Sequence, residues 1–175
     1  RAVAEDALDA IVVQYEALAA VVDVDEAIAA DAPLLHPAVG SNVPSDRHFS
    51  YGDPDGAFAS APHRVGLTVR YPRNSCTPIE CYVVLAECMP GDEGYEVTSN
   101  FQGPFSLHTV MALALQIPAA RLRLRTPPDS GGSFGVKQGV FPYIVMMCLA
   151  ARKAGAPVKW VEDRLEHLVA DTWAT

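Results

Sequence analysis

Hydrophobic positions recur at helical spacing most clearly over residues 139–155. Arg152 and Lys153 stand in the last turn of this pattern, and Gly155 follows closely. Basic residues in a last turn and a glycine just beyond it are typical of helix C-termini. The segment therefore predicts the best-defined helix of the chain, with Gly155 as its C′ residue.

Alternation of apolar and polar residues predicts strands in the C-terminal part of the chain. Over residues 64–71, Val65, Leu67, Val69 and Tyr71 share one face. Apolar or alternating runs of similar length predict four further strands, at residues 81–87, 95–101, 120–126 and 157–162.

A turn-forming sequence connects the first two of these four predicted strands. The sequence PGDEG occupies residues 90–94 and combines proline, glycine and acidic residues. Such residues favour tight turns because they accept or fix the backbone angles that a turn needs. Residues 81–101 are therefore predicted to form a hairpin.

Cap signals define two further helices in the C-terminal part. Residues 106–118 predict a helix with Ser106 as its N-cap and Pro118 closing it. Residues 163–173 predict another, with Asp163 as its N-cap.

The N-terminal segment reads as a small unit of helix, strand and helix. Residues 4–11 carry acidic side chains in the first turn and predict a helix. Residues 11–18 predict a strand. Residues 23–30 predict a second short helix, with Asp23 or Asp25 as its cap.

Residues 37–62 break this order. They contain four prolines and three glycines, and no hydrophobic periodicity survives in them. We interpret the segment as a linker or an irregular connection between two modules.

The composition of the chain argues against a membrane span and against nucleic acid as a partner. Half of the residues are hydrophobic, yet no apolar run approaches the ~18–20 residues of a membrane helix, so no membrane span is predicted. The net charge is −8 and uneven: residues 1–100 carry 5 − 16 = −11, and residues 101–175 carry 8 − 5 = +3. The acidic half argues against nucleic acid as a partner. The basic half suits an anionic small ligand, although a solvated basic face explains the charge equally well.

The four cysteines do not predict a metal site. Three of them are spaced C-x4-C-x6-C, which fits neither a zinc site nor the common iron–sulfur motifs. We interpret all four as free or buried thiols of a reducing compartment and predict a cytoplasmic protein. The residues are Cys76, Cys81, Cys88 and Cys148.

No pair of carboxylates predicts acid–base chemistry. Asp163 and Glu166 flank Arg164, and we interpret them as a helix start and a solvated or ion-paired face. Glu80 is given no role. The five histidines show no HxH or HExxH spacing, so no metal role is predicted for them.

The sequence SGGSFGVK at residues 130–137 is the strongest candidate for binding chemistry. It lies between a predicted strand and a predicted helix, an arrangement that exposes backbone amides to anions. A Walker loop is excluded because Val136 separates Gly135 from Lys137, and Gln138 replaces the magnesium-binding hydroxyl. Dinucleotide and kinase glycine loops also differ in spacing or in the element that follows. A general nucleotide-phosphate site is therefore the weakest hypothesis.

Several segments together resemble a known family. The loop fits the pattern G-G-[GS]-F-G-x-K, and PVKW and an R-x-E follow it in the family's order. TSNFQGPF precedes the loop, and VVQYEALAAVVDVDEAI lies near the start of the chain. In this combination the chain resembles the molybdopterin-binding large subunit of the xanthine dehydrogenase and aldehyde oxidase family. It is most similar to the large subunits of aerobic carbon monoxide dehydrogenase and their relatives.

The resemblance implies an α+β fold in two parts. Residues 1–36 would be the end of an α/β hammerhead-type domain, and residues 37–62 the linker. Residues 63–175 would be the N-terminal part of a mixed-sheet molybdopterin-binding domain.

The resemblance also implies cofactor-binding residues. Gln102 would donate a hydrogen bond toward the apical oxo ligand of molybdenum, a role that suits a neutral amide. Gly132, Ser133, Phe134 and Gly135 would lie against the site, where glycine lets backbone approach the cofactor and Phe134 forms an apolar wall. No protein side chain would ligate the metal.

The implied activity is that of a molybdenum hydroxylase. The cofactor would be molybdopterin, in plain or dinucleotide form, carrying molybdenum and oxidising or hydroxylating a small substrate with water as the oxygen source. Electrons would pass to iron–sulfur and FAD-binding partner subunits. The general-base glutamate of the family is expected beyond Thr175, so we expect a fragment that is inactive alone and contains no catalytic residue.

Two alternatives and the substrate stay open at this point. A non-catalytic module could dock partner subunits without chemistry, and a nucleotide-phosphate binder is a weaker possibility. Gln138 and Gly139 follow Lys137 where purine and aldehyde enzymes have a glutamate, which argues weakly against xanthine-type recognition. Carbon monoxide, an aromatic heterocycle and an aldehyde all remain possible substrates.

Overall fold

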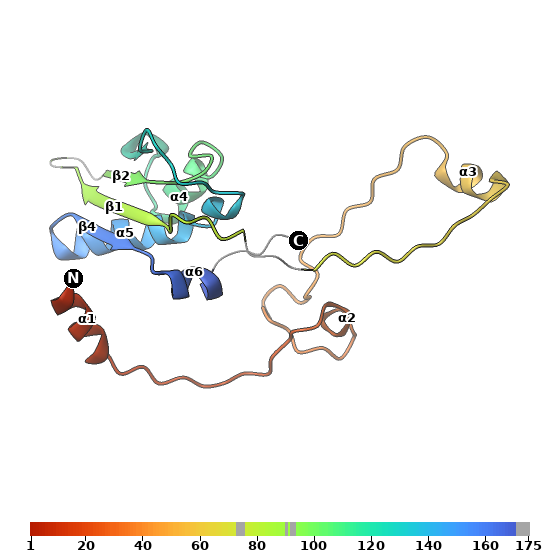
Figure 1. Ribbon diagram of the computed structural model, residues 1–175, viewed down its shortest axis with the longest axis horizontal. Coiled ribbons are helices and arrows are strands. Elements are labelled where there is room, and N and C mark those ends of the chain that lie inside the picture. The colour runs from red at the N-terminus through yellow and green to blue at the C-terminus, as the bar shows by residue number, and fades with distance from the viewer. Residues whose placement is uncertain (73–75, 90, 92–93, 171–175) are drawn as a thin grey trace. The chain divides into compact units, whose positions relative to one another are not determined.

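The structure is a computed structural model that describes residues 1–72, 76–89, 91 and 94–170 (Figure 1). The chain divides into two compact units, Arg1–Gly66 and Leu67–Thr175. The predicted boundaries at residues 36 and 62 remain predictions.

The N-terminal unit contains three short helices and no sheet. They are α1 (Ala2–Asp9), α2 (Val24–Ala27) and α3 (Pro54–Ser60). No side chain among residues 1–66, all of which are described, is buried. The unit is therefore held together by local hydrogen bonds rather than by an apolar core.

Side-chain hydrogen bonds account for the local order of this unit. Asp23 accepts hydrogen bonds from the backbone amides of Asp25 and Glu26 and caps α2, so the first of the two predicted cap residues is the right one. The side chain of Asn42 donates to the carbonyl of Ala27 at 3.0 Å and accepts from the amide of Leu35 at 2.9 Å. This amide thus ties α2 to the chain that follows it.

Two predictions for this unit are corrected. Residues 11–18 form no strand, because no described segment pairs with them and their apolar side chains lie in solvent. Residues 37–62 are irregular for most of their length but include α3. The sequence contains a signal for it: Asp53 caps α3, and Pro54 follows at its first position.

The C-terminal unit is built on a four-stranded mixed sheet with strand order β3-β2-β1-β4. Its strands are β1 (Val83–Cys88), β2 (Tyr95–Ser99), β3 (Leu122–Arg125) and β4 (Val158–Val161). β1 pairs antiparallel with β2 and β4, and β2 pairs parallel with β3. The predicted hairpin is confirmed, as are the strands predicted at 120–126 and 157–162. The predicted turn of the hairpin, residues 90–94, lies partly outside the described residues.

One face of the sheet carries the core. Val84 and Ala86 of β1 and Val97 of β2 are fully buried, and they belong to a cluster that includes residues of α4 (His108–Ala114) and α5 (Phe141–Ala154). The opposite face is open, with Leu85 partly exposed and Lys159 exposed. The period-two pattern of the strands therefore sorts apolar side chains to the helix-covered face.

The helix predictions hold except at α4, which ends at Ala114 and not at the predicted Pro118; residues 171–173 of the last predicted helix lie outside the described residues. α5 ends at Gly155, whose φ of 62° is left-handed, as predicted. α6 (Arg164–Ala170) begins after Asp163, which accepts from the amide of Glu166 at 3.0 Å, while Glu166 accepts from the amide of Asp163. Ser106 is not the N-cap of α4. Leu107 holds that position, because Ser106 is used in a turn with Gly103.

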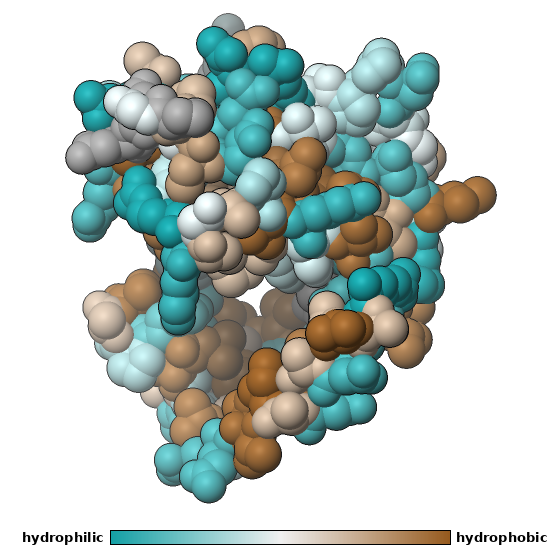
Figure 2. Space-filling model, turned by 90° about the vertical axis from the view of Figure 1, so that its left-hand side faces the viewer, coloured by the Kyte–Doolittle hydropathy of each residue, from teal (hydrophilic) through white to brown (hydrophobic). Residues whose placement is uncertain are grey.

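The strand predicted at residues 64–71 is absent. Its apolar side chains are exposed, Val65 to 91%, because none of the described residues supplies a partner strand for it. Figure 2 shows apolar residues at the surface beside hydrophilic ones.

Among the helices that the structure describes, none has the length and apolar character that spanning a membrane would require.

Candidate functional site

The glycine-rich loop connects β3 to α5. Residues 130–135 have no regular structure, and a short 3₁₀ helix, η2 (Val136–Gln138), leads from them toward α5. The predicted order of strand, loop and helix is therefore confirmed. β3 and α5 are both packed in the core, so they hold the two ends of the loop in place.

Gln102 lies directly beside this loop. Its side-chain oxygen, Oε1, accepts hydrogen bonds from the hydroxyl of Ser133 and from the backbone amide of Gly135, the latter at 3.1 Å. Its own backbone amide donates to the carbonyl of Lys137 at 3.3 Å. The structure thus brings together three of the predicted site residues, Gln102, Ser133 and Gly135.

These contacts fix which end of the Gln102 amide faces outward. Both hydrogen-bond donors point at Oε1, and an amide oxygen accepts while its nitrogen donates. Rotating the amide by half a turn would place its NH₂ group against the backbone amide of Gly135, which can only donate. Gln102 is exposed, so its Nε2 is left as a neutral donor at the surface of the loop.

The glycines of the loop are required for two different reasons. A Cβ on Gly131 would lie 2.5 Å from the Cβ of Glu80, so that glycine is required by a neighbouring piece of chain. Gly132 and Gly135 have φ of 92° and 100°, which side-chain-bearing residues rarely adopt. At Gly135 no atom of the described residues lies within 4 Å of the position that a Cβ would take. Its backbone is therefore open to an approaching group.

Phe134 also stands in an unusual position. Its φ is 55°, and its ring is 73% exposed. A left-handed backbone at a bulky residue is strained, and such strain collects at functional sites. The ring is therefore available to line a site and is not a residue of the core.

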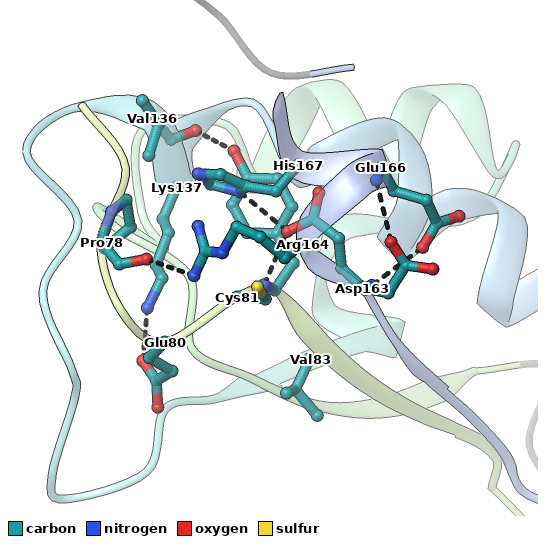
Figure 3. Close-up of polar contacts among 12 residues, drawn as sticks. Pro78, Glu80, Cys81, Val83, Val136, Lys137, Asp163, Arg164, Glu166 and His167 are labelled. Carbon is teal, nitrogen blue, oxygen red and sulfur yellow. Dashed lines mark hydrogen bonds and ion pairs between the residues drawn. The ribbon is translucent and has the colours of Figure 1, made fainter. Parts of the chain in front are cut away.

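The other side of the loop is anchored by a charge pair. Lys137 is fully buried, and its ammonium group forms an ion pair with Oε2 of Glu80 (Figure 3). The same oxygen accepts a hydrogen bond from the amide of Gly131 at 2.9 Å. Burial alone would raise the pKa of Glu80, but hydrogen bonds from Lys137, Asn100 and Gly131 hold that pKa below its ordinary value.

A buried polar cluster continues from this anchor toward α6. The hydroxyl of Tyr82 donates to the carbonyl of Val136, and the amide of Tyr82 donates to the carboxylate of Glu162 at 3.0 Å. Glu162 also contacts Nδ1 of His167 at 2.9 Å. Both Glu162 and His167 are buried, so the carboxylate is satisfied by the backbone and the imidazole rather than by water.

Arg164 holds the segment in front of β1. Its guanidinium donates to the carbonyl of Pro78 at 2.7 Å (Figure 3) and to the carbonyl of Ile79 at 2.8 Å. The segment that contributes Glu80 is thereby fixed on both sides, by α6 and by the loop.

Cys81 lies beside Glu80 among these residues, and burial raises the pKa of its thiol (Figure 3). All four cysteines are free, and burial, together with Cys88, raises the pKa of Cys148 to about 12. The part of the chain that is described contains no group of three or more His, Cys, Asp or Glu residues suited to a metal ion.

Sequence reasoning misses the residues that support the loop. No pattern assigns a role to Glu80, although it contacts both Gly131 and Lys137. No pattern singles out Glu162 or His167 either. Only Lys137 carries a signal, since it belongs to the loop motif, while its partner Glu80 is 57 residues away in the chain.

A comparison with known families finds a match over most of the chain. The sequence profile of the molybdopterin cofactor-binding domain matches residues 35–174. The chain belongs to this family. The resemblance found in the loop and its flanking motifs is therefore confirmed.

Relatives of this molybdopterin cofactor-binding domain align over nearly the whole chain. It is 35% identical to the carbon monoxide dehydrogenase large chain of Hydrogenophaga pseudoflava, covering 99% of this chain and 23% of that one. It is 34% identical to the nicotine 6-hydroxylase large subunit of Paenarthrobacter nicotinovorans, covering 99% of this chain and 21% of that one. The chain thus spans less than a quarter of the length of these relatives.

Solved structures of the family share the fold. Quinoline 2-oxidoreductase from Pseudomonas putida 86 superposes with a TM-score of 0.83 at 31% identity, covering 100% of this chain and 22% of that one. Reconstituted CO dehydrogenase from Oligotropha carboxidovorans superposes with a TM-score of 0.76 at 29% identity, covering 99% and 23%. The mixed α/β architecture predicted from the sequence is confirmed at this level.

Proposed function

We propose that this chain is part of the large subunit of a molybdopterin-dependent oxidoreductase and forms one wall of its cofactor site. The observation that carries the proposal is the amide of Gln102. Its oxygen is occupied by Ser133 and Gly135, so the nitrogen of this exposed side chain is left as a neutral donor, and the backbone of Gly135 beside it has open space.

The residues of the loop fit a bulky, polar cofactor. Gln102 would donate through Nε2 without carrying a charge, and would therefore orient an oxygen of the cofactor without changing its protonation. Gly132 and Gly135 would let the backbone approach, and Ser133 would hold the Gln102 amide. Phe134 would exclude water with its exposed ring.

Bound molybdopterin would supply the two-electron redox chemistry, and this chain would supply binding and orientation. The substrate would be a small molecule that is oxidised or hydroxylated with water as the oxygen source. We assign no general base to these residues and expect that glutamate in the rest of the complete protein. The isolated chain is therefore expected to be inactive.

The remaining features of the resemblance belong to the same proposal. Residues 1–36 would be the end of an α/β hammerhead-type domain, 37–62 a linker, and 63–175 the start of the molybdopterin-binding domain. Iron–sulfur and FAD-binding subunits would accept the electrons, and the complex would be cytoplasmic. The name of one relative, a dehydrogenase complex subunit gamma of Paenarthrobacter nicotinovorans, supports an assembly of several subunits.

Metal and cofactor analysis of the complete natural protein, followed by a substrate panel, tests the proposal. We expect about one molybdenum and one pterin per large subunit, and turnover of a carbon monoxide, heterocycle or aldehyde substrate. A protein with neither molybdenum nor pterin would refute the proposal and favour a non-catalytic docking module.

Gln102→Leu tests the residue that carries the argument. This change keeps the approximate size of the side chain and removes its donor, so we expect turnover to fall by about 10²-fold, as for the loss of one oriented donor at a reacting centre. The electron paramagnetic resonance spectrum of Mo(V) should shift as well. Gln14→Leu is the matched control, because Gln14 is exposed in the N-terminal unit.

A further inference from the structure

One carboxylate oxygen holds both ends of the glycine loop. Oε2 of Glu80 accepts from the amide of Gly131 at one end and from the ammonium group of Lys137 at the other. Glu80 comes from the segment before β1, which Arg164 fixes independently through Pro78 and Ile79. Glu80 therefore clamps the loop to the segment before β1.

This clamp connects directly to the donor side of the loop. The backbone of Lys137 donates through its amide to the hydroxyl of Ser133 at 3.1 Å and accepts through its carbonyl from the amide of Gln102. Ser133 in turn donates to Oε1 of Gln102. A displacement of Lys137 would therefore move the Ser133 hydroxyl that orients the Gln102 side chain, and the carbonyl that holds the Gln102 backbone.

The packing indicates that the position of the clamp is specific. Gly131 lies so close to Glu80 that a Cβ there would collide with the side chain at 2.5 Å. Lys137 is fully buried, whereas the Glu80 side chain is 35% exposed. A buried ammonium group needs a charged partner, so Glu80 is held against the loop by electrostatics as well as by shape.

We propose that Glu80 is a positioning residue for the cofactor-binding loop, and that it acts through Gly131 and Lys137 without touching the cofactor. The inference rests on the proposed function of the loop. It assigns Glu80 the task of keeping the Gly131–Lys137 spacing that points the Gln102 amide and the Gly135 backbone outward.

Two double variants of the complete natural protein separate positioning from stability. Glu80→Gln with Lys137→Met removes both charges but keeps an acceptor for the Gly131 amide. Glu80→Leu with Lys137→Met removes the charges and the acceptor. Replacing a buried ion pair by neutral groups of similar volume is often tolerated, so we expect both to fold with similar melting temperatures.

The readout is the molybdenum and pterin content per protein after gel filtration. We expect the double variant with Glu80→Leu to retain the cofactor roughly 10-fold less well than the one with Glu80→Gln, the size typical for loss of an outer-shell partner. Equal retention at equal melting temperature would show that Glu80 is only structural. The control is Glu87→Gln on the exposed side of β1, which should retain the cofactor fully.

Amide hydrogen exchange provides a second readout that needs no variant. In the wild-type protein the Gly131 amide should exchange at least roughly 10-fold more slowly than an unstructured glycine, because Glu80 accepts from it. Unprotected exchange at Gly131 would overturn the inference. If the wild-type protein contained no molybdenum or pterin, the proposed function would be refuted. The exchange rate of the Gly131 amide would still show whether Glu80 holds the loop.

Discussion

The two units of this chain have similar apolar patterns but differ in what they bury. Residues 83–88 and 95–99 form strands whose inward side chains are fully covered by α4 and α5. Residues 11–18 have a comparable β-like pattern, yet Leu18 is 85% exposed and no strand forms. The pattern states which face could be buried, and a partner segment is needed to bury it.

This difference places the apolar core and the candidate site in the same unit. The glycine loop, Gln102 and the Glu80–Lys137 pair all lie in the unit that has an apolar core. An oriented donor such as Gln102 needs a rigid support, because a loosely held amide would sample both of its orientations. The N-terminal unit has no comparable support within residues 1–66.

The largest expected effect comes from matched truncations in the two units. Ile144→Ala removes a fully buried side chain of α5 and should lower the free energy of unfolding by about 2–5 kcal/mol. Leu18→Ala should lower it by less than about 0.5 kcal/mol, because Leu18 is exposed. Urea unfolding of the 175-residue chain, followed by circular dichroism, measures both, and equal losses would contradict the comparison.

Gly155→Ala should have the next largest effect. Gly155 has a φ of 62° at the end of α5, and no described atom lies close to the position that a Cβ would take, so the cost is purely conformational. We expect a loss of about 1–2 kcal/mol in the free energy of unfolding. Gly66→Ala is the control, since Gly66 has open space and no left-handed φ, and thermal unfolding that ranks Gly66→Ala as the more harmful would be contrary evidence.

Removing helix caps should give a smaller difference between the units. Asp163→Ala removes the cap of α6 and should destabilise the C-terminal unit by about 1 kcal/mol. Asp53→Ala removes the cap of α3, which buries no side chain, so it should reduce helical content without moving the cooperative urea transition. A shifted transition in Asp53→Ala would mean that α3 is coupled to the core.

The smallest expected effect is the pH dependence contributed by Glu80. Its pKa in the folded chain lies below the ordinary value of 4.5, so its stabilising contribution is present above that value. The contribution is lost as the pH falls from 4.5 through the lower, folded pKa. Urea midpoints measured across this range should decline less steeply in Glu80→Gln than in the wild type, and parallel curves would argue against the charge pair.

Local signals in the sequence predict much of the fold. The helix over 139–155 and the caps Asp23 and Asp163 depend on neighbouring residues, and the structure confirms them. The two absent strands, at 11–18 and 64–71, depend on pairing with distant segments, which periodicity does not encode. Ser106 fails as a cap for a local reason: it belongs to a turn in which its backbone amide donates to the carbonyl of Gly103.

The sequence predicts those residues of the candidate site that belong to a recognisable motif. The loop and Gln102 belong to segments that resemble the family, and the structure brings them together. Glu80 and Glu162 cannot be found in this way, since their partners are defined by folding: Lys137 is 57 residues from Glu80, and Tyr82 is 80 residues from Glu162.

The most direct test of the central claim compares two glycines that look alike in this chain. Gly135 and Gly155 both have positive φ and open space where a Cβ would stand, but only Gly135 lies beside the Gln102 amide. In the complete natural protein, Gly135→Ala should lower the molybdenum content per protein by roughly 10-fold, while Gly155→Ala should leave it unchanged. Equal molybdenum content in the two variants would contradict the claim that the open side of the loop holds the cofactor.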